Sequence, residues 1–333
     1  MSKRLIKVFG VGLLALSLML AACSNSSDKS EASLVENKTA NESTIESANE
    51  TKVVQDMFGE VTIPTDSKNM IVTSSIYAEY LIEMGITPQM VVVVPEIEPA
   101  YRASYFEEHG VKMIEGVQYQ YNYEQLLSLA PDLILARGSG MEQKEYDALS
   151  KVAPTIAVDS NSEMGDAMPK LAQLFNKKAE TEKILKEFDE KAQKAKLKIK
   201  QALGDKTVLV LRVEHNRYRY LGSQAGDSSE FFYQTLGLNI PEILKDSKDW
   251  FTPFSLEILP DIHPDFVFLE QRILKDYDTT DSMKNLEASS LWNNLDAVKN
   301  NHVFPINTND FVQGTGPIGS SLLIDYIVEK LVP

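Results

Sequence analysis

The chain has 333 residues, a formal net charge of −15 at pH 7 and a single cysteine. An acidic surface repels nucleic acid and anionic lipid, so the charge argues against DNA binding and against adsorption to a membrane surface. A single cysteine excludes an internal disulfide, so packing must stabilise the fold.

Residues 1–22 have the layout of a secretory signal peptide. Basic residues within the first seven positions precede an almost wholly apolar stretch at 8–22, which is too short and wrongly flanked for a transmembrane helix. Leu-Ala-Ala-Cys at 20–23 resembles the lipobox of bacterial lipoproteins, where cleavage precedes the cysteine and the cysteine is acylated. We expect Cys23 to be a lipid anchor; an ordinary secretory signal with an incidental cysteine is the alternative.

Residues 23–52 are predicted to be the lipidated cysteine followed by a disordered tether. This segment is rich in Ser, Asn, Glu, Thr and Lys and has no aromatic residue, so it cannot bury enough apolar surface to offset its ordering entropy. The folded part is expected to begin near residue 53, with a hairpin over 53–64 that turns at Phe58-Gly59.

Short apolar strands alternate with helical patterns over residues 53–162. This alternation predicts an N-terminal lobe built on a parallel sheet. The predicted strands are 70–72, 90–94, 133–135 and 155–158, and the predicted helices are 76–84, 122–130 and 142–152.

Residues 177–203 contain neither Gly nor Pro and predict one continuous helix. Ile184, Phe188, Ala192, Ala195 and Ile199 recur at steps of three or four residues and form one helical face. A helix of about 26 residues is about 39 Å long, so we interpret 163–204 as a linker that contains a rigid backbone helix. A coiled coil is the weaker alternative because the apolar stripe is narrow and spans fewer than about four heptads.

A second α/β series over residues 205–333 predicts a C-terminal lobe. Its predicted strands are 207–213, 218–221, 266–269 and 303–306, and its predicted helices are 228–236, 255–259 and 318–331. The predicted fold is therefore two Rossmann-like α/β lobes joined by a single long α-helix, with a ligand cleft between the lobes.

No sequence motif supports catalysis or a protein-bound metal. The chain lacks a Gly-x-Ser-x-Gly elbow, a P-loop and a His-Glu-x-x-His motif. Its four histidines, at positions 109, 215, 263 and 302, are scattered singly. We therefore predict a binding protein rather than an enzyme, with no metal site made of side chains.

Two arginines stand in positions that suit an anionic ligand. Arg137 follows the predicted strand 133–135 in a Gly-rich turn, and ligands of open α/β sheets bind at the carboxyl ends of strands. Arg212 lies inside the apolar strand 207–213, where a guanidinium needs an anionic partner. An internal ion pair with Asp or Glu is the alternative for each.

Aromatic rings accompany further arginines. In 217–220 Arg and Tyr alternate, so both arginines share one face and both tyrosines the other. Tyr101-Arg102 and Trp250-Phe251 add rings and a cation. Such groups suit a large, anionic and partly planar ligand, although a tyrosine can equally be part of the core.

Four segments carry a resemblance to a known family. They are GVQYQYNYEQLLSLAPDLILARGSG (116–140), the long helix, WFTPFSLEILPDIHPDFVFL (250–269) and LWNNLDAVKNNHVFPIN (291–307). On these segments the chain resembles the substrate-binding lipoproteins of iron-siderophore ABC importers, a class that also includes haem and vitamin B12 binders. The resemblance covers residues 53–333.

The resemblance implies roles for single residues. Arg137 and Arg212 match ligand-contacting positions, and Arg102 corresponds to a further basic contact. Glu124 and Glu257 match the pair that docks onto arginines of the permease; without the resemblance each would be assigned to a solvated helix face. The further ligand-binding candidates are Tyr218, Arg217, Arg219 and Trp250.

The resemblance implies a receptor for a ferric siderophore, anchored to the outer face of the cytoplasmic membrane through Cys23. Anionic citrate-hydroxamate, hydroxamate or carboxylate siderophores are favoured. Iron would be held by the siderophore itself, so no cofactor is expected. The expected partners are an ABC permease and, through it, its ATPase, and the receptor is expected to be monomeric. The alternatives are a haem or corrinoid binder of the same class and a siderophore hydrolase that uses His215 with a nearby serine.

Overall fold

The computed structural model describes residues 50–117, 120–160, 164–224, 226–272 and 278–333, and Ala48–Pro333 forms one compact unit. The predicted signal peptide, Cys23 and the tether up to residue 49 lie outside the described residues. Among the helices of the described ranges, none combines the length and the apolar character that a membrane span requires.

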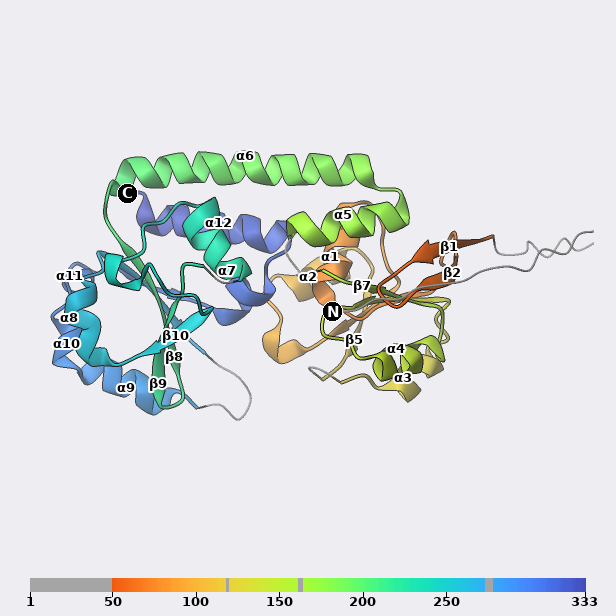
Figure 1. Ribbon diagram of the computed structural model, residues 1–333, viewed down its shortest axis with the longest axis horizontal. Helices are drawn as coiled ribbons and strands as arrows, with labels where there is room; N and C mark the ends of the chain where they lie inside the picture. Colours follow the sequence, from red (N-terminus) through yellow and green to blue (C-terminus); the bar gives the residue numbers. More distant parts are fainter. Residues whose placement is uncertain (1–49, 118–119, 161–163, 225, 273–277) are drawn as a thin grey trace, which may run out of the picture. The chain divides into compact units, whose positions relative to one another are not determined.

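The first lobe is built on a five-stranded parallel sheet with the order β5-β4-β3-β6-β7 (Figure 1). Alternate residues of a strand point to opposite faces, so each strand feeds two apolar layers. In β6, Leu133 and Leu135 face α1 and α5, whereas Ile134 and Ala136 face α3 and α4. The elements of this lobe are β3 (Met70–Val72), α1 (Ser75–Glu83), β4 (Met90–Val93), α2 (Arg102–Glu108), β5 (Lys112–Glu115), α3 (Tyr123–Ser128), β6 (Leu133–Arg137), α4 (Gln143–Ser150), β7 (Thr155–Val158) and α5 (Met164–Phe175).

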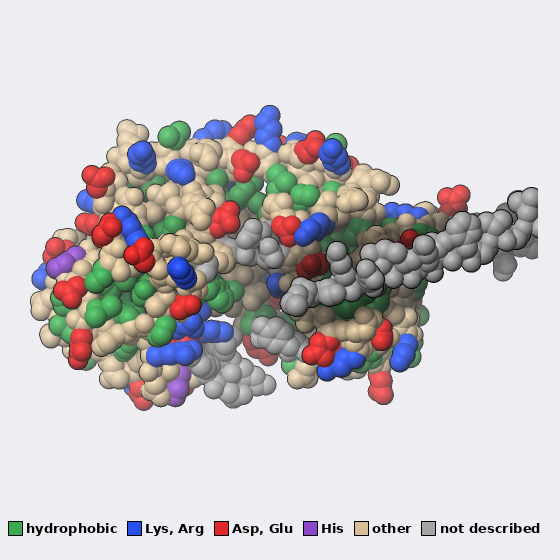
Figure 2. Space-filling view, viewed as in Figure 1, with side chains coloured by type: hydrophobic (Ala, Val, Ile, Leu, Met, Phe, Trp, Pro, Cys, Tyr) green, Lys and Arg blue, Asp and Glu red, His purple; other side chains and the backbone are tan. Residues whose placement is uncertain are grey.

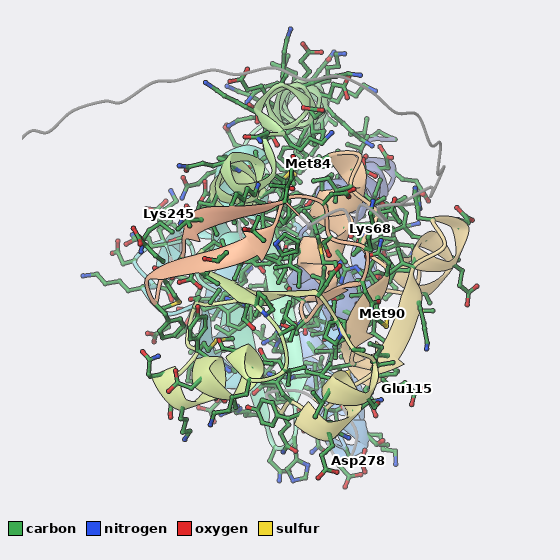
Figure 3. All side chains as sticks on the ribbon, turned by 90° about the vertical axis from the view of Figure 1, so that its right-hand side faces the viewer. Lys68, Met84, Met90, Glu115, Lys245 and Asp278 are labelled. Atoms are coloured by element: carbon green, nitrogen blue, oxygen red, sulfur yellow. The ribbon has the colours of Figure 1, made fainter. Side chains whose placement is uncertain are left out.

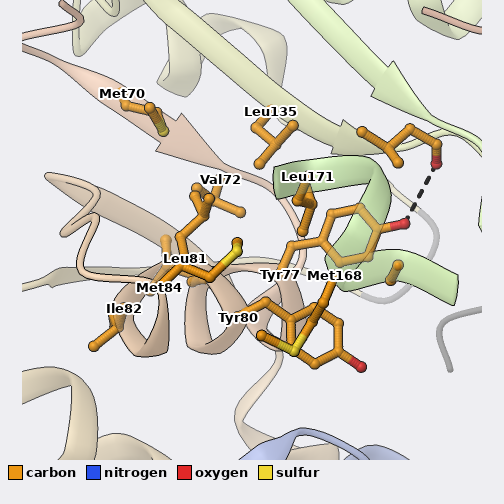
Figure 4. Packing of buried hydrophobic residues seen from close by; sticks show 14 of the residues in the cluster. Met70, Val72, Tyr77, Tyr80, Leu81, Ile82, Met84, Leu135, Met168 and Leu171 are labelled. Atoms are coloured by element: carbon orange, nitrogen blue, oxygen red, sulfur yellow. Dashed lines mark hydrogen bonds between the residues drawn. The ribbon is translucent and has the colours of Figure 1, made fainter. Parts of the chain in front are cut away.

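Tyrosine side chains contribute to the larger apolar layer of this lobe (Figure 4). Tyr77 and Tyr80 of α1 are fully buried against Val72 and Met168. Tyr77 donates a hydrogen bond to the carbonyl oxygen of Val158 at 3.3 Å. Burial without a bond would be costly for a phenol, so this bond ties α1 to the edge strand β7.

The predicted N-terminal hairpin is confirmed as β1 (Thr51–Gln55) and β2 (Glu60–Pro64). Asp56 shapes its turn by accepting hydrogen bonds from the amides of Phe58 at 2.8 Å and Gly59 at 3.0 Å. The same carboxylate accepts a bond from the amide of Ala157 at 2.9 Å, so the turn covers the exposed edge of β7.

The second lobe contains a mixed five-stranded sheet with the order β10-β9-β8-β11-β12. β8, β11 and β12 are parallel, whereas β9 and β10 are antiparallel additions at one side. All seven residues of β8 are buried, as expected for the centre of a sheet covered on both faces. The elements are β8 (Val208–Glu214), β9 (Arg217–Leu221), α7 (Asp227–Ser229), β10 (Phe251–Phe254), α8 (Leu259–Ile262), β11 (Phe266–Gln271), α9 (Thr280–Ala288), α10 (Ser290–Asn293), α11 (Asp296–Lys299), β12 (Val303–Ile306) and α12 (Pro317–Leu331).

The predicted long helix is confirmed as α6 (Lys178–Leu203), a single helix of 26 residues. Its apolar stripe packs on α5 in the first lobe and along α12 in the second, and Met84 of the first lobe lies beneath it (Figure 3). Its outer face carries alternating charges (Figure 2), with Lys–Glu pairs four residues apart such as Lys183–Glu187. The two lobes are therefore joined by a rigid element that is buried on one side only.

Several elements were not predicted, and each has a local reason. α5 contains Pro169, which disfavours a helical interior, and α2 is only seven residues long. β10 contains Pro253, which is tolerated because β10 is an edge strand. The predicted helix 228–236 is the short α7 followed by a π-helical turn at Glu230–Thr235.

Truncation of a buried residue of α6 tests how strongly the helix is fixed to the lobes. Ile199 is 2% exposed and Leu197 is 67% exposed on the same helix. Ile199→Ala should lower the free energy of unfolding by about 3 kcal/mol because it leaves a cavity, while Leu197→Ala should change it by less than about 0.5 kcal/mol. Urea denaturation measures both; equal losses would contradict the described packing of α6.

Candidate functional site

A cavity of about 760 Å³ lies between the two lobes. In the first lobe it is lined by residues at the carboxyl ends of β3 and β6, among them Thr73 and Ser74, which follow β3, and Arg137, the last residue of β6. The strand order changes direction between these two neighbours, since β4 and β5 lie on one side and β7 on the other. Such a switch point leaves a crevice at the carboxyl ends of the strands, where open α/β sheets bind their ligands.

Second-lobe residues close the other side of the cavity. Trp250 precedes β10 and is 39% exposed, and Gly226 leaves room for its ring, because a Cβ there would lie 3.3 Å from Trp250 Cδ1. Ser228, Gln313 and Thr315 add hydroxyl and amide groups to the lining. The second lobe therefore offers the cavity the aromatic surface of Trp250 surrounded by neutral polar groups, and Tyr121 adds an aromatic ring from the first lobe.

Arg137 reaches the cavity from the end of β6, where the backbone stays close to β7. Arg137 is the last residue of β6 and is exposed. The next amide, of Gly138, donates to the carbonyl oxygen of Val158 at 2.7 Å, and a Cβ at this glycine would lie 2.3 Å from Met57 Sδ and 3.1 Å from the Val158 carbonyl carbon. A larger residue would have to displace Met57 and crowd the β7 backbone, so glycine suits this close approach.

The charged lining residues other than Arg137 are acidic. Among the described residues around the cavity, Arg137 is the single basic one, whereas Glu98, Glu142 and Glu145 are acids. Glu98 binds Arg102 at 2.9 Å. Glu142 binds Lys144 at 2.8 Å, which lowers the pKa of Glu142, and Glu145 accepts a bond from the amide of Glu142 at 3.0 Å. Each of these three acids therefore already contacts a group of the first lobe.

Arg102 is placed away from the cavity lining, in a buried ion cluster. It is 1% exposed and donates to Glu79 at 3.1 and 3.2 Å and to Glu98 at 2.9 Å. Burial by itself lowers the pKa of Arg102, but the attraction of Glu79, Tyr101 and Glu98 outweighs burial and raises it. The structure therefore shows an internal ion pair at this position.

Arg212 is also buried, at 1% exposure, and pairs with Glu270 of the neighbouring strand β11. Its guanidinium lies 3.5 Å from the ring centre of Phe251 and 5.3 Å from that of Trp250. Within the described part of the chain, Nη2 of Arg212 has no hydrogen-bond partner. Burial lowers the pKa of Arg212 and raises that of Glu270, against their mutual attraction, so this pair is less well compensated than the one at Arg102.

Glu214, at the end of β8, gathers further arginines around one buried carboxylate. It is fully buried and contacts Arg217, Arg219 at 3.4 Å and Arg272 at 3.3 Å. Burial raises the pKa of Glu214, but the hydrogen bond from Arg217 and the surrounding guanidinium groups lower it overall. Sequence reasoning missed Glu214 and Arg272, although an acid two residues after Arg212, at the end of an otherwise apolar strand, was a usable signal.

The remaining predicted residues fall at separate places. Tyr218 is half-buried and donates to the carbonyl oxygen of Ser282 at 2.7 Å within the second lobe. Glu124 lies in the first turn of α3 and Glu257 in the first turn of the 3-10 helix Leu256–Ile258, and both are exposed. The described residues hold no group of three or more His, Cys, Asp or Glu side chains able to bind a metal. Of the predicted ligand-binding residues, Arg137 and Trp250 line the cavity.

Two α/β lobes, a connecting helix and a cavity between the lobes define a bilobal ligand-binding protein. The sequence profile of the periplasmic binding protein family matches residues 70–309. The chain belongs to this family.

Similar proteins extend over nearly the whole chain. The iron(3+)-hydroxamate-binding protein FhuD of Bacillus subtilis is 29% identical over 98% of both chains, and the Fe(3+)-citrate-binding protein YfmC of the same organism is 25% identical over 99% of this chain and 98% of its own.

Solved structures share the fold. A periplasmic binding protein component of a Fep/Fec-like ferrichrome ABC transporter from Bacillus subtilis is 27% identical, with a TM-score of 0.68 over 84% of this chain and 99% of its own. SirA of Staphylococcus aureus, solved in complex with staphyloferrin B, is 24% identical with the same TM-score over 84% of this chain and 98% of its own. The predicted fold class, two α/β lobes joined by one long helix, is confirmed.

Removal of the Glu214 charge should give a pH-dependent loss of stability. A carboxyl group whose pKa is lowered on folding stabilises the fold above its unfolded pKa, and this contribution disappears as the pH falls through the folded value. Glu214→Gln should therefore cost roughly 1–2 kcal/mol near neutral pH, because it leaves the partly exposed guanidinium groups of Arg217, Arg219 and Arg272 without their anionic partner. The difference from the unchanged chain should shrink in acid; urea denaturation across the pH range measures it, and a pH-independent difference would contradict this assignment.

Proposed function

We propose that this protein is the receptor of an ABC importer and captures a ferric siderophore in the cavity between its lobes. The observation that carries the proposal is the placement of Arg137 and Trp250, one from each lobe, on the wall of a cavity at the switch point of the first sheet. A volume of about 760 Å³ lies within the range of typical small-molecule sites, about 300–1,000 Å³.

The side chains around the cavity suit a ligand that carries its own metal. A hard ferric ion prefers oxygen ligands, and the oxygens of a siderophore supply these without any protein group. Hydroxyl and amide groups such as Ser74, Gln313 and Thr315 can bond to peripheral carbonyls of the ligand. Arg137 would donate to its most negative oxygens and Trp250 would pack on its body.

The charge of the lining favours a ferric hydroxamate as the ligand. With Arg137 as the single described lining cation beside three acids, a neutral ferric trihydroxamate costs less to desolvate than a multiply charged ferric citrate. The similarity to FhuD of Bacillus subtilis, named as an iron(3+)-hydroxamate-binding protein, supports this class.

A citrate or carboxylate siderophore is the second candidate, and the arginines around Glu214 favour it. Four guanidinium groups, of Arg212, Arg217, Arg219 and Arg272, surround the two carboxylates of Glu214 and Glu270, so this part of the second lobe has a surplus of positive charge. We propose that it receives an anionic arm of the ligand if the siderophore has one.

We propose binding without chemical change. His215, the remote candidate for a hydrolytic base, contacts the carbonyl oxygen of Asp278 at 2.8 Å through Nδ1 and Asn216 at 2.8 Å through Nε2, so its ring is engaged outside the cavity lining. Recovery of chemically intact siderophore after long incubation would support this, and hydrolysed ligand would contradict it.

Haem or cobalamin is the alternative ligand. A Soret or corrinoid absorption band in the purified protein would favour it over a siderophore.

Delivery would use the exposed acids of the two lobes and the lipid anchor. We propose that Glu124 and Glu257 meet basic residues of the permease, and that the receptor acts as a monomer. We also propose cleavage after residue 22, acylation of Cys23 and a tether to about residue 52, followed by lobes that begin near residues 53 and 205. The predicted linker 163–204 contains α5, which packs in the first lobe, so α6 is the part of it that joins the lobes. A short tether would raise the effective concentration of receptor at its permease on the outer face of the membrane.

Replacement of Arg137 tests the ligand site. Arg137→Ala should weaken the binding of a ferric trihydroxamate such as ferrichrome by roughly tenfold, because it removes a charge-assisted hydrogen bond. Lys151→Ala, which removes an exposed cation of the same lobe away from the cavity lining, is the matched control and should leave affinity unchanged. Quenching of tryptophan fluorescence measures both, with ferric citrate, a ferric catecholate, haem and cobalamin as competing ligands; equal affinity of both variants would overturn the role of Arg137.

Charge reversal at the proposed docking acids should separate binding from transport. Glu124→Arg with Glu257→Arg should leave ferrichrome affinity unchanged, since both side chains are exposed outside the main cavity, and should reduce iron uptake by cells roughly tenfold or more through like-charge repulsion. The control is the conservative pair Glu124→Asp with Glu257→Asp. Normal uptake with both charges reversed would exclude these acids from docking.

A further inference from the structure

A buried cluster of charged and phenolic side chains lies where the second lobe meets the first. Glu79 of α1 is fully buried and Arg102 of α2 is 1% exposed. Arg102 donates to Glu79 from Nε at 3.2 Å and from Nη2 at 3.1 Å, and the hydroxyl of Tyr101 donates to the same Glu79 oxygen at 2.7 Å. The hydrogen bonds described for this oxygen, Oε2 of Glu79, all come from residues of the first lobe.

Both charged groups of this cluster also bond to the backbone of the second lobe. The amide of Ile318 donates to Oε1 of Glu79 at 3.0 Å, and Nη2 of Arg102 donates to the carbonyl oxygen of Gln313 at 2.8 Å. Ile318 lies in the first turn of α12, whose N-cap residue, Gly316, has no side chain. Glu79 therefore supplies the capping oxygen and the negative charge that the N-terminus of α12 lacks in its own lobe.

Two glycines of the second lobe permit this close contact. A Cβ at Gly316 would lie 2.2 Å from Oε1 of Glu79, and a Cβ at Gly319 would lie 2.6 Å from the hydroxyl of Tyr101 and 2.2 Å from the carbonyl oxygen of Gly314 in its own lobe. Gly316 has a φ of −76°, which any residue adopts, so space rather than backbone conformation explains the glycine at this position.

The cluster reaches the ligand cavity from both lobes. Glu98 of the first lobe and Gln313 of the second both line the cavity, and Arg102 bonds to both of them. Next to them, Nδ2 of Asn309 donates to the carbonyl oxygens of Glu96 at 3.1 Å and Glu98 at 3.2 Å. The separation between Glu98 and Gln313 is therefore fixed by groups behind the cavity wall.

We propose that Glu79 and Arg102 are positioning residues that hold segment 313–318 of the second lobe against the first and so set the width of the ligand cavity. They act through Glu98 and Gln313 and do not touch the ligand. Removal of Arg102 would leave Glu79 buried without its cationic partner, and removal of Glu79 would leave Arg102 with Glu98 alone. The inference rests on the proposed function for the identity of the ligand.

A single methyl group inserted at the contact tests this inference without changing a charge. Gly316→Ala places that methyl group where Glu79 lies and should push segment 313–318 away. The backbone amide of Ile318 should then exchange with deuterium roughly tenfold faster in ligand-free protein, and the dissociation constant for ferrichrome should rise roughly tenfold. Gly165→Ala is the matched control, because a Cβ there has no neighbour within 4 Å.

A second substitution distinguishes a positioning role from a general loss of stability. Glu79→Asp shortens the side chain by one methylene, so Glu79→Asp with Gly316→Ala should bind ferrichrome more tightly than Gly316→Ala alone. Unchanged exchange at Ile318 in Gly316→Ala would overturn the inference, as would faster exchange with unchanged affinity. If the unsubstituted chain binds no siderophore, the proposed function fails, whereas the exchange comparison still decides whether Glu79 holds α12.

Discussion

The relation between the two lobes depends on a carboxylate of one lobe that caps a helix of the other. The buried carboxylate of Glu79 accepts hydrogen bonds from Arg102 and Tyr101 of its own lobe and from the amide of Ile318 in α12. The long helix α6 holds the lobes together over a greater length, but it contacts them from outside and does not border the cavity. The Glu79 contact lies directly behind the cavity wall, so it constrains the site where a ligand would bind.

Among the described residues, Arg102 with Glu79 and Arg212 with Glu270 are buried guanidinium–carboxylate pairs, and they differ in how completely their polar atoms have hydrogen-bond partners. The attraction at Arg102 outweighs burial and raises its pKa, as expected for a structural contact. At Arg212 burial dominates, and Nη2 has no hydrogen-bond partner among the described residues. Arg212 also lies 5.3 Å behind the Trp250 ring that lines the cavity. The first pair therefore suits a structural role, whereas the second retains a hydrogen-bond donor without a described partner, behind the Trp250 wall of the cavity.

The hydrophobic pattern predicted the fold because central strands of both sheets, such as β3 and β8, are buried and mostly apolar, and because α6 is an uninterrupted helix. It failed where tertiary contacts override local preference, as at Pro169 inside α5 and Pro253 on an edge strand. The site was less predictable. The position of Arg137 follows from strand topology, but whether a buried arginine such as Arg102 faces a ligand or a carboxylate depends on residues far away in sequence, and no local pattern encodes that pairing.

The central claim is that the ligand cavity exists before the ligand arrives, because the lobes are already fixed relative to each other. Electron spin resonance distances between nitroxide labels on Lys144→Cys in α4 and Lys284→Cys in α9, in a chain without Cys23, test it directly. Both lysine side chains are exposed, by 77% and 70%, and their helices belong to opposite lobes (Figure 1). The account predicts that saturating ferrichrome changes this distance by less than about 2 Å. A larger closure of the lobes would contradict it.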